Sequence, residues 1–122
     1  MPQSPTQVMT IPPLPGAETG QRELYLPEGQ LPPGEYGVMD MPDDSMEGLG
    51  IRAGDRLVIL LTQEAPDGAA AVAMVDGHLL VRQLFRNPDG CLLQPCRVGL
   101  PAVSLKQPHI LGRVVLLQRT FI

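Results

Sequence analysis

The chain has 122 residues, a hydrophobic content of 43% and a formal net charge of −4. This length fits one domain that buries roughly two-thirds of its unfolded surface. Binding of a phosphate backbone requires clustered Lys and Arg, which a net negative charge does not favour. We therefore expect no direct nucleic acid binding by this chain.

The distribution of apolar and basic residues predicts neither a membrane span nor a signal peptide. No run approaches the roughly 18 consecutive apolar residues of a membrane span, and the first residues lack the basic patch and apolar stretch of a signal peptide. We therefore expect a cytoplasmic protein with no membrane association. In that compartment Cys91 and Cys96 favour two reduced thiols over a disulfide. With no second Cys or His cluster nearby, we expect no metal and no cofactor.

Residues 1–34 carry many of the 14 prolines. Proline forbids a long helix and discourages a central strand. We interpret 1–34 as an extended arm that packs on the domain or hangs free, and 35–122 as the folded domain.

From Glu35 onward, short apolar runs alternate with turn signals. Residues 56–61 (RLVILL) are a nearly continuous apolar run, typical of a buried strand. The alanines of 69–75 favour a helix by propensity, but the pattern favours a strand. Asp76-Gly77 between two apolar runs predicts a hairpin, because a type I′ turn needs positive φ at both central residues. The expected strands are 35–41, 56–61, 69–75, 78–84, 91–94 and 110–118, a spacing that predicts an all-β barrel or sandwich.

The segment richest in chemistry is residues 41–59 (MPDDSMEGLGIRAGDRLVI). Ser45-Met46 precedes a glycine-rich turn, then Gly54-Asp55 and an apolar strand. A serine hydroxyl is a weak nucleophile at neutral pH and requires a base within hydrogen-bond reach. Taken alone, such a serine is also typical of an ST-turn or a helix N-cap.

This segment resembles the nucleophile motif of the LexA/UmuD self-cleaving peptidases, and bacterial signal peptidases share its Ser-Met and Gly-Asp parts. The resemblance covers residues 35–122 and, more loosely, the arm. It implies an all-β, mainly β, LexA C-terminal-domain-like barrel or sandwich. It also implies that Ser45 is the nucleophile and that the backbone amides of Asp44 and Ser45 form an oxyanion hole.

In this family a lysine in a Val-Lys-Arg-Leu-like context is the general base, because burial disfavours its charged form. Here the context is Val81-Arg82-Gln83-Leu84, so Arg82 takes the lysine's place. Arginine has a pKa above ~12 and cannot accept the serine proton.

Two other residues are candidate bases. The single lysine, Lys106, lies near the loop before the final strand. His78 lies two alternations along its strand from Arg82, roughly 13 Å away. A base role for Lys106 would need an unusual geometry. His78 is too far away to replace Arg82 simply, so a solvent-facing role is favoured for it. His109 has no partner in the pattern. Asp43 and Asp44 favour a solvated turn over paired carboxylates, because adjacent residues in an extended segment point in opposite directions.

The arm resembles the family's cleavage region. There the cleaved bond is typically Ala-Gly or Cys-Gly, a few residues after a Pro-containing apolar segment. Residues 11–20 (IPPLPGAETG) place the matching bond at Thr19-Gly20. Thr is bulkier than Ala and β-branched, and Glu18 adds a charge where a small apolar residue is usual.

Two functions follow from the resemblance. One is an interaction module that has lost self-cleavage through Arg82. It would dimerise through its C-terminal strand and act in a DNA-damage (SOS) or phage-type transcriptional response. A related repressor, a recombinase filament or a polymerase would be its partner. The other is an active serine autoprotease that cuts its own arm near Thr19-Gly20 with Ser45 as nucleophile. A third reading, a small β-barrel of unrelated function, is disfavoured by the Ser-Met to Gly-Asp motif.

Overall fold

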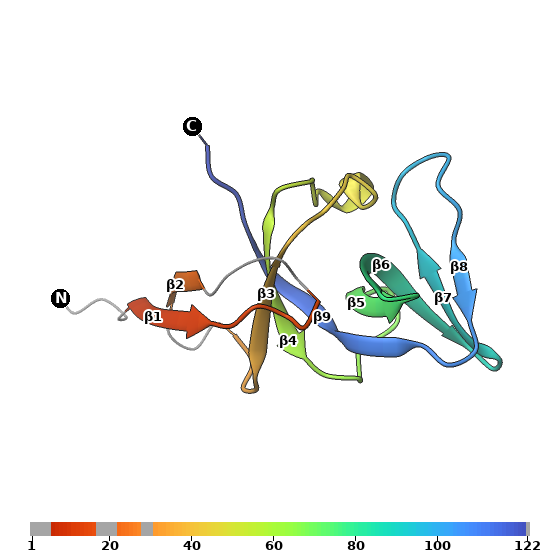
Figure 1. The fold of residues 1–122 in the computed structure, drawn as a ribbon, viewed down its shortest axis with the longest axis horizontal. Helices are drawn as coiled ribbons and strands as arrows, with labels where there is room; N and C mark the ends of the chain where they lie inside the picture. Colours follow the sequence, from red (N-terminus) through yellow and green to blue (C-terminus); the bar gives the residue numbers. More distant parts are fainter. Residues whose placement is uncertain (1–5, 17–21, 28–30, 122) are drawn as a thin grey trace.

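A computed structural model describes residues 6–16, 22–27 and 31–121, with only the backbone described for 6–10 and 22–27 (Figure 1). Strands dominate these ranges, so the all-β prediction is confirmed. The strand pair β1 (Thr6–Ile11) and β2 (Arg22–Pro27) forms a separate antiparallel sheet. In Figure 1 this small sheet lies at the opposite end of the molecule from β7 and β8.

The main sheet is antiparallel and has seven strands in the order β3-β4-β9-β5-β6-β7-β8. Its members are β3 (Tyr36–Asp40), β4 (Arg56–Leu61), β5 (Ala70–Val75), β6 (His78–Asn87), β7 (Gly90–Gln94), β8 (Val103–Leu105) and β9 (His109–Gln118). A single turn of 3-10 helix, η1 (Glu47–Leu49), interrupts the connection from β3 to β4. No helix in the described ranges has the length and apolar character needed to cross a membrane.

The β5–β6 hairpin forms as predicted. Asp76 and Gly77 have φ values of 50° and 79°, as a type I′ turn requires. Asp76 is the one non-glycine residue with positive φ among the described residues. The register that starts at this turn pairs Val75 with His78 and places Arg82 opposite Ala71.

The core is aliphatic and lies on both faces of the central strands. Val72 of β5 and Val81 of β6 belong to one buried cluster, which also contains Met46. Ala71 and Leu84 belong to a second cluster. Because successive side chains of a strand point to opposite faces, neighbouring residues of β5 enter different clusters. This burial fixes the position of β6, the strand that carries Arg82.

Part of the arm packs against the domain. The Leu14 amide donates to the Val38 carbonyl, and the Val38 amide donates to the Pro12 carbonyl, each at 3.0 Å. These bonds form a parallel bridge on β3. Leu14 and Ile11 are 2% and 1% exposed. The described part of the arm therefore completes the core, while the domain boundary at residue 34 stays a prediction.

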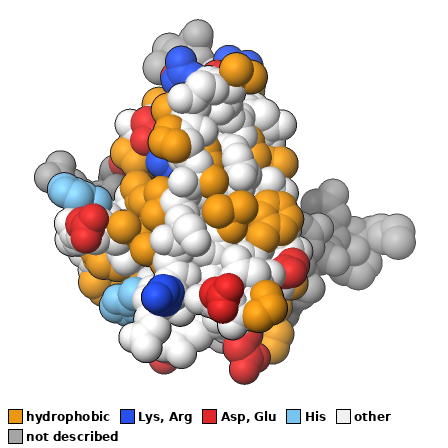
Figure 2. Space-filling model, turned by 90° about the vertical axis from the view of Figure 1, so that its right-hand side faces the viewer, with side chains coloured by type: hydrophobic (Ala, Val, Ile, Leu, Met, Phe, Trp, Pro, Cys, Tyr) orange, Lys and Arg blue, Asp and Glu red, His pale blue; other side chains and the backbone are white. Residues whose placement is uncertain are grey.

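The end of the molecule formed by β6, β7 and β8 carries exposed hydrophobic side chains (Figure 2). Among them are Phe85 on β6, and Val98 and Leu100 in the connection from β7 to β8. Val98 is fully exposed, at 101% of its reference area, so a substitution there is a neutral control.

Candidate functional site

Ser45 lies in the connection from β3 to η1 and is 2% exposed. The segment after β7 holds it in place. The Cys96 amide donates to the Ser45 carbonyl at 2.8 Å, and the Gly48 amide donates to the Cys96 carbonyl at 2.8 Å. A Cβ at position 48 would lie 2.7 Å from that carbonyl oxygen, so the close approach requires glycine.

Arg82 lies on β6 and reaches the serine. Its Nη1 donates to Ser45 Oγ at 2.7 Å and to the Val81 carbonyl at 2.8 Å. The structure thus brings together two residues that are 37 positions apart and that the sequence paired. A guanidinium donates hydrogen bonds and accepts none. This contact therefore gives Ser45 a donor and no base.

Asp43 forms the other side of the site. The Ser45 amide donates to Asp43 Oδ1 at 3.0 Å. Burial alone would raise the pKa of Asp43. The side-chain and backbone hydrogen bonds from Ser45, together with the charges of Arg82 and Arg97, outweigh burial and hold that pKa below its ordinary value. The sequence analysis missed this contact. The signal that could have found it is the i, i+2 spacing of an Asx-turn.

Both residues expected to form the oxyanion hole have contacts within the turn, Ser45 through its amide and Asp44 through its carboxylate. The Ser45 amide contacts the Asp43 carboxylate. The Asp44 carboxylate accepts a hydrogen bond from the Ala53 amide at 3.0 Å, which ties the serine turn to the glycine-rich turn before β4. The oxyanion role of these two amides stays a prediction.

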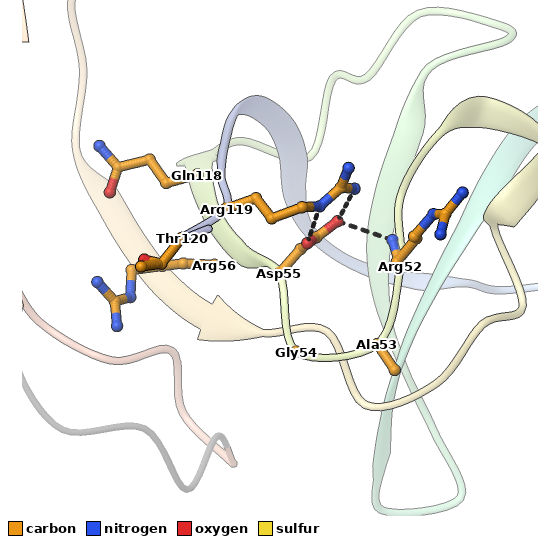
Figure 3. Close-up of a pocket in the computed structure, with 8 residues that line it drawn as sticks. All are labelled: Arg52, Ala53, Gly54, Asp55, Arg56, Gln118, Arg119 and Thr120. Carbon is orange, nitrogen blue, oxygen red and sulfur yellow. Dashed lines mark hydrogen bonds and ion pairs between the residues drawn. The ribbon is translucent and has the colours of Figure 1, made fainter. Parts of the chain in front are cut away.

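A buried carboxylate fixes the far side of the same turn (Figure 3). Asp55 is 3% exposed and accepts hydrogen bonds from Arg119 Nε at 2.7 Å, from Arg119 Nη2 at 2.6 Å and from the Arg52 amide at 2.8 Å. Arg119 Nη2 also donates to the Gly50 carbonyl at 2.8 Å. The hydrogen bonds from Arg119, helped by the Arg52 amide, outweigh burial and lower the pKa of Asp55.

This pair ties the residue after β9 to the turn that follows Ser45. The sequence analysis recognised the Gly54-Asp55 motif but not the role of Arg119, which is 64 positions away. A hollow of about 320 Å³ lies beside the pair, and its lining includes Arg56 and Thr120. Neither Ser45 nor Arg82 lines this hollow, so it is separate from the serine site.

The remaining sequence candidates lie elsewhere. His78 is exposed at the start of β6, and His109 is exposed at the start of β9. Lys106 is exposed beside Gly90, whose partner in the sheet is Asn87. Asn87 is five residues along β6 from Arg82, a separation of roughly 17 Å. Thr19, Gly20 and Glu18 lie outside the described residues.

Both cysteines are free thiols. Cys91 is 1% exposed, and burial raises the pKa of its thiol. Cys96 Sγ lies 3.4 Å from Gln83 Oε1, next to the backbone that holds Ser45.

Comparison with known proteins identifies relatives of this arrangement. The model of the Peptidase S24-like family matches residues 9–115. The chain is similar to the LexA repressor of Leuconostoc mesenteroides subsp. mesenteroides, with 32% identity over 70% of this chain and 41% of the relative. The LexA repressor of Desulforamulus reducens is 28% identical over 88% of this chain and 50% of the relative. That of Pelotomaculum thermopropionicum is 30% identical over 88% of this chain and 53% of the relative. The chain spans about half the length of these relatives.

Proposed function

Since the chain belongs to the Peptidase S24-like family, we propose that it acts as a dimerising LexA/UmuD-type interaction module whose self-cleavage is lost through Arg82. The observation that carries this proposal is the 2.7 Å hydrogen bond from Arg82 Nη1 to Ser45 Oγ. The position that must supply a base holds a permanent cation instead.

The chemistry explains why this residue stops the reaction. A serine attacks a peptide carbonyl only as its proton leaves for a base. With a pKa above about 12, an arginine is deprotonated in fewer than about one in 10⁵ molecules at pH 7. The guanidinium also occupies an acceptor site on Ser45 Oγ, the atom that would attack. The arginine orients the serine hydroxyl without activating it.

A module without cleavage acts through its surfaces. In the proposed module the dimer contact involves the C-terminal strand, as the resemblance implies. Along β9 the residues from Arg113 to Gln118 are only partly buried, and Phe121 beyond the strand is 88% exposed. Partly buried apolar side chains on β9 and the exposed Phe121 beyond it favour association through a surface of the domain. The proposed role is regulatory, in a DNA-damage or phage-type transcriptional response, with a related repressor, a recombinase filament or a polymerase as partner.

Restoring the lysine tests the catalytic part of the proposal. Arg82→Lys and the unmodified chain are incubated at pH 7 and pH 10, and their intact masses are followed. We expect only Arg82→Lys to lose residues 1–19, and faster at pH 10, because high pH deprotonates the lysine. Arg82→Gln is the matched control, since it removes the charge without supplying a base.

The same experiment needs a control for the nucleophile. Adding Ser45→Ala to Arg82→Lys should abolish the loss. Cleavage that persists without Ser45 would contradict the assignment of the nucleophile. Cleavage of Arg82→Gln would show that a different residue is the base.

Self-association is tested separately by size exclusion with light scattering. We expect a species of twice the chain's 13.2 kDa, and Phe121→Ser should shift it toward the monomer. Because Phe121 is exposed, this change should leave the unfolding temperature of the monomer, measured at low protein concentration, unaltered. A strict monomer at high concentration would contradict the dimer.

A further inference from the structure

Asp43 is the charged residue of the site that the family resemblance left without a role. Its Oδ1 accepts the Ser45 amide at 3.0 Å, while Ser45 Oγ accepts Arg82 Nη1 at 2.7 Å. Ser45 therefore connects a carboxylate on one side to a guanidinium on the other. The serine turn places an anion next to the position of the general base.

Two other charged residues around the site have contacts of their own, although the charge of Arg97 also helps to lower the pKa of Asp43. Arg97, from the connection after β7, faces Glu47 of η1 with an Nε–Oε1 distance of 3.8 Å. The Asp44 carboxylate accepts the Ala53 amide. Arg82 is the β6 residue whose charge reaches Ser45, and its Nε is buried without a hydrogen-bond partner in the described structure. Asp43 is thus the carboxylate of this turn that contacts the same serine as Arg82.

We propose that Asp43 is the counter-ion of position 82. Acting through Ser45, its carboxylate stabilises a positive charge there and so favours an arginine over a neutral lysine base. This inference rests on the proposed function, in which position 82 is the base position of the family. Asp43 is a positioning residue, because it acts on the charge and orientation of Arg82 and Ser45. The lowered pKa of Asp43 fits this role, since a carboxylate that is ionised at neutral pH is needed to favour the cation.

The Asp43 carboxylate would act on any lysine placed at position 82. A nearby opposite charge favours the protonated amine and raises its pKa, which opposes what a Ser-Lys dyad requires. Asp43 is exposed, so water and salt screen its effect. We therefore expect the effect at the lower end of the usual range, about one pKa unit, or about tenfold in the fraction of neutral amine near pH 7.

The ammonium can be titrated directly because the chain has a single natural lysine, Lys106. In Arg82→Lys labelled at lysine side chains, NMR would show two side-chain signals, and Lys106, exposed at a distance from Ser45, is the internal reference. Adding Asp43→Asn should lower the pKa of the introduced lysine by about 1 and leave that of Lys106 unchanged. The asparagine keeps a side-chain oxygen for the Ser45 amide, so the turn retains its hydrogen bond.

Asp44→Asn is the matched control. It removes an equal charge one residue away, from a carboxylate that contacts Ala53 and not Ser45. We expect it to change the pKa of the introduced lysine by less than half as much as Asp43→Asn, and we expect added salt to reduce the effect of Asp43→Asn. Equal effects of the two substitutions, or no effect of Asp43→Asn, would overturn the proposal.

Cleavage gives a second and independent readout. The pH profile of arm loss should move about one unit toward lower pH in Arg82→Lys with Asp43→Asn, compared with Arg82→Lys alone. A profile that stays in place while both variants cleave would overturn the role of Asp43. Should neither variant cleave, the proposed loss of catalysis through Arg82 alone fails, while the NMR titration still decides the role of Asp43.

Discussion

Replacing Leu14 by Ala should destabilise the whole domain, although this residue belongs to the proline-rich arm. Leu14 is 2% exposed and belongs to the same buried cluster as Leu57 and Val81. A Cβ at Gly37 would lie 2.5 Å from Leu14 Cδ2, so the side chain is closely surrounded. Buried Leu→Ala substitutions cost 2–5 kcal/mol, and a segment at the edge of the sheet can partly close the cavity, so we expect about 3 kcal/mol. For a chain of this length that lowers the unfolding temperature by about 10 °C.

Thermal and urea unfolding measure this change, with Val98→Ala as the exposed control that should stay within about 0.5 kcal/mol of the unmodified chain. Hydrogen exchange reports on the contact itself, because the amides of Leu14 and Val38 are bonded across it. An unfolding free energy for Leu14→Ala within about 0.5 kcal/mol of the control, with both amides still protected, would refute the reasoning that this segment completes the core.

Two further predictions concern the turn around Ser45. Asp55 has a folded-state pKa below its ordinary value of 3.8, so its contribution to stability is present above pH 3.8 and is lost as the pH falls through the folded-state pKa. In urea unfolding between pH 7 and pH 2.5, the free energy of unfolding should therefore fall less with acid for Asp55→Asn than for the unmodified chain. An equal fall in both proteins would contradict this. Gly48→Ala should cost about 2 kcal/mol, because its Cβ would push away the Cys96 backbone and weaken two hydrogen bonds of about 1 kcal/mol each. Unchanged urea unfolding of that variant would show that the 95–97 segment does not hold the serine turn.

The parts of the fold that the sequence could predict are those set by local physics. The apolar run 56–61 coincides with β4, because a strand buried on both faces needs apolar residues throughout. The Asp76-Gly77 turn has its predicted backbone because few residue pairs adopt positive φ twice. Once this turn is fixed, the register of β6 is fixed too, and the position of Arg82 follows from it.

The strands that were missed have weak local signals. β8 has only three residues and forms by pairing with β7, so no periodicity marks it. The prolines around β1 and β2 favour an extended arm over strands. Within residues 6–16 the prolines follow β1 rather than interrupt it, and Pro27 is the last residue of β2. The prolines therefore mark the limits of these strands.

Site residues were predictable where a sequence motif identifies both partners, and not where one partner lies outside any motif. Ser45 and Arg82 came from recognisable sequence contexts, and their side chains meet. The ion pair of Asp55 with Arg119 depends on where β9 ends relative to the turn before β4. That relation is set by the pairing of two strands distant in sequence, and no pattern around either residue records it.

The most direct test of the central claim is the intact mass of the unmodified chain during prolonged incubation at pH 10. We predict the full mass of 13.2 kDa throughout, because an arginine cannot accept the serine proton and the lowered pKa of Asp43 makes its carboxylate a weak base. Loss of residues 1–19 that Ser45→Ala abolishes would contradict it. Another group would then be accepting the serine proton, and Arg82 would not be the cause of an inactive site.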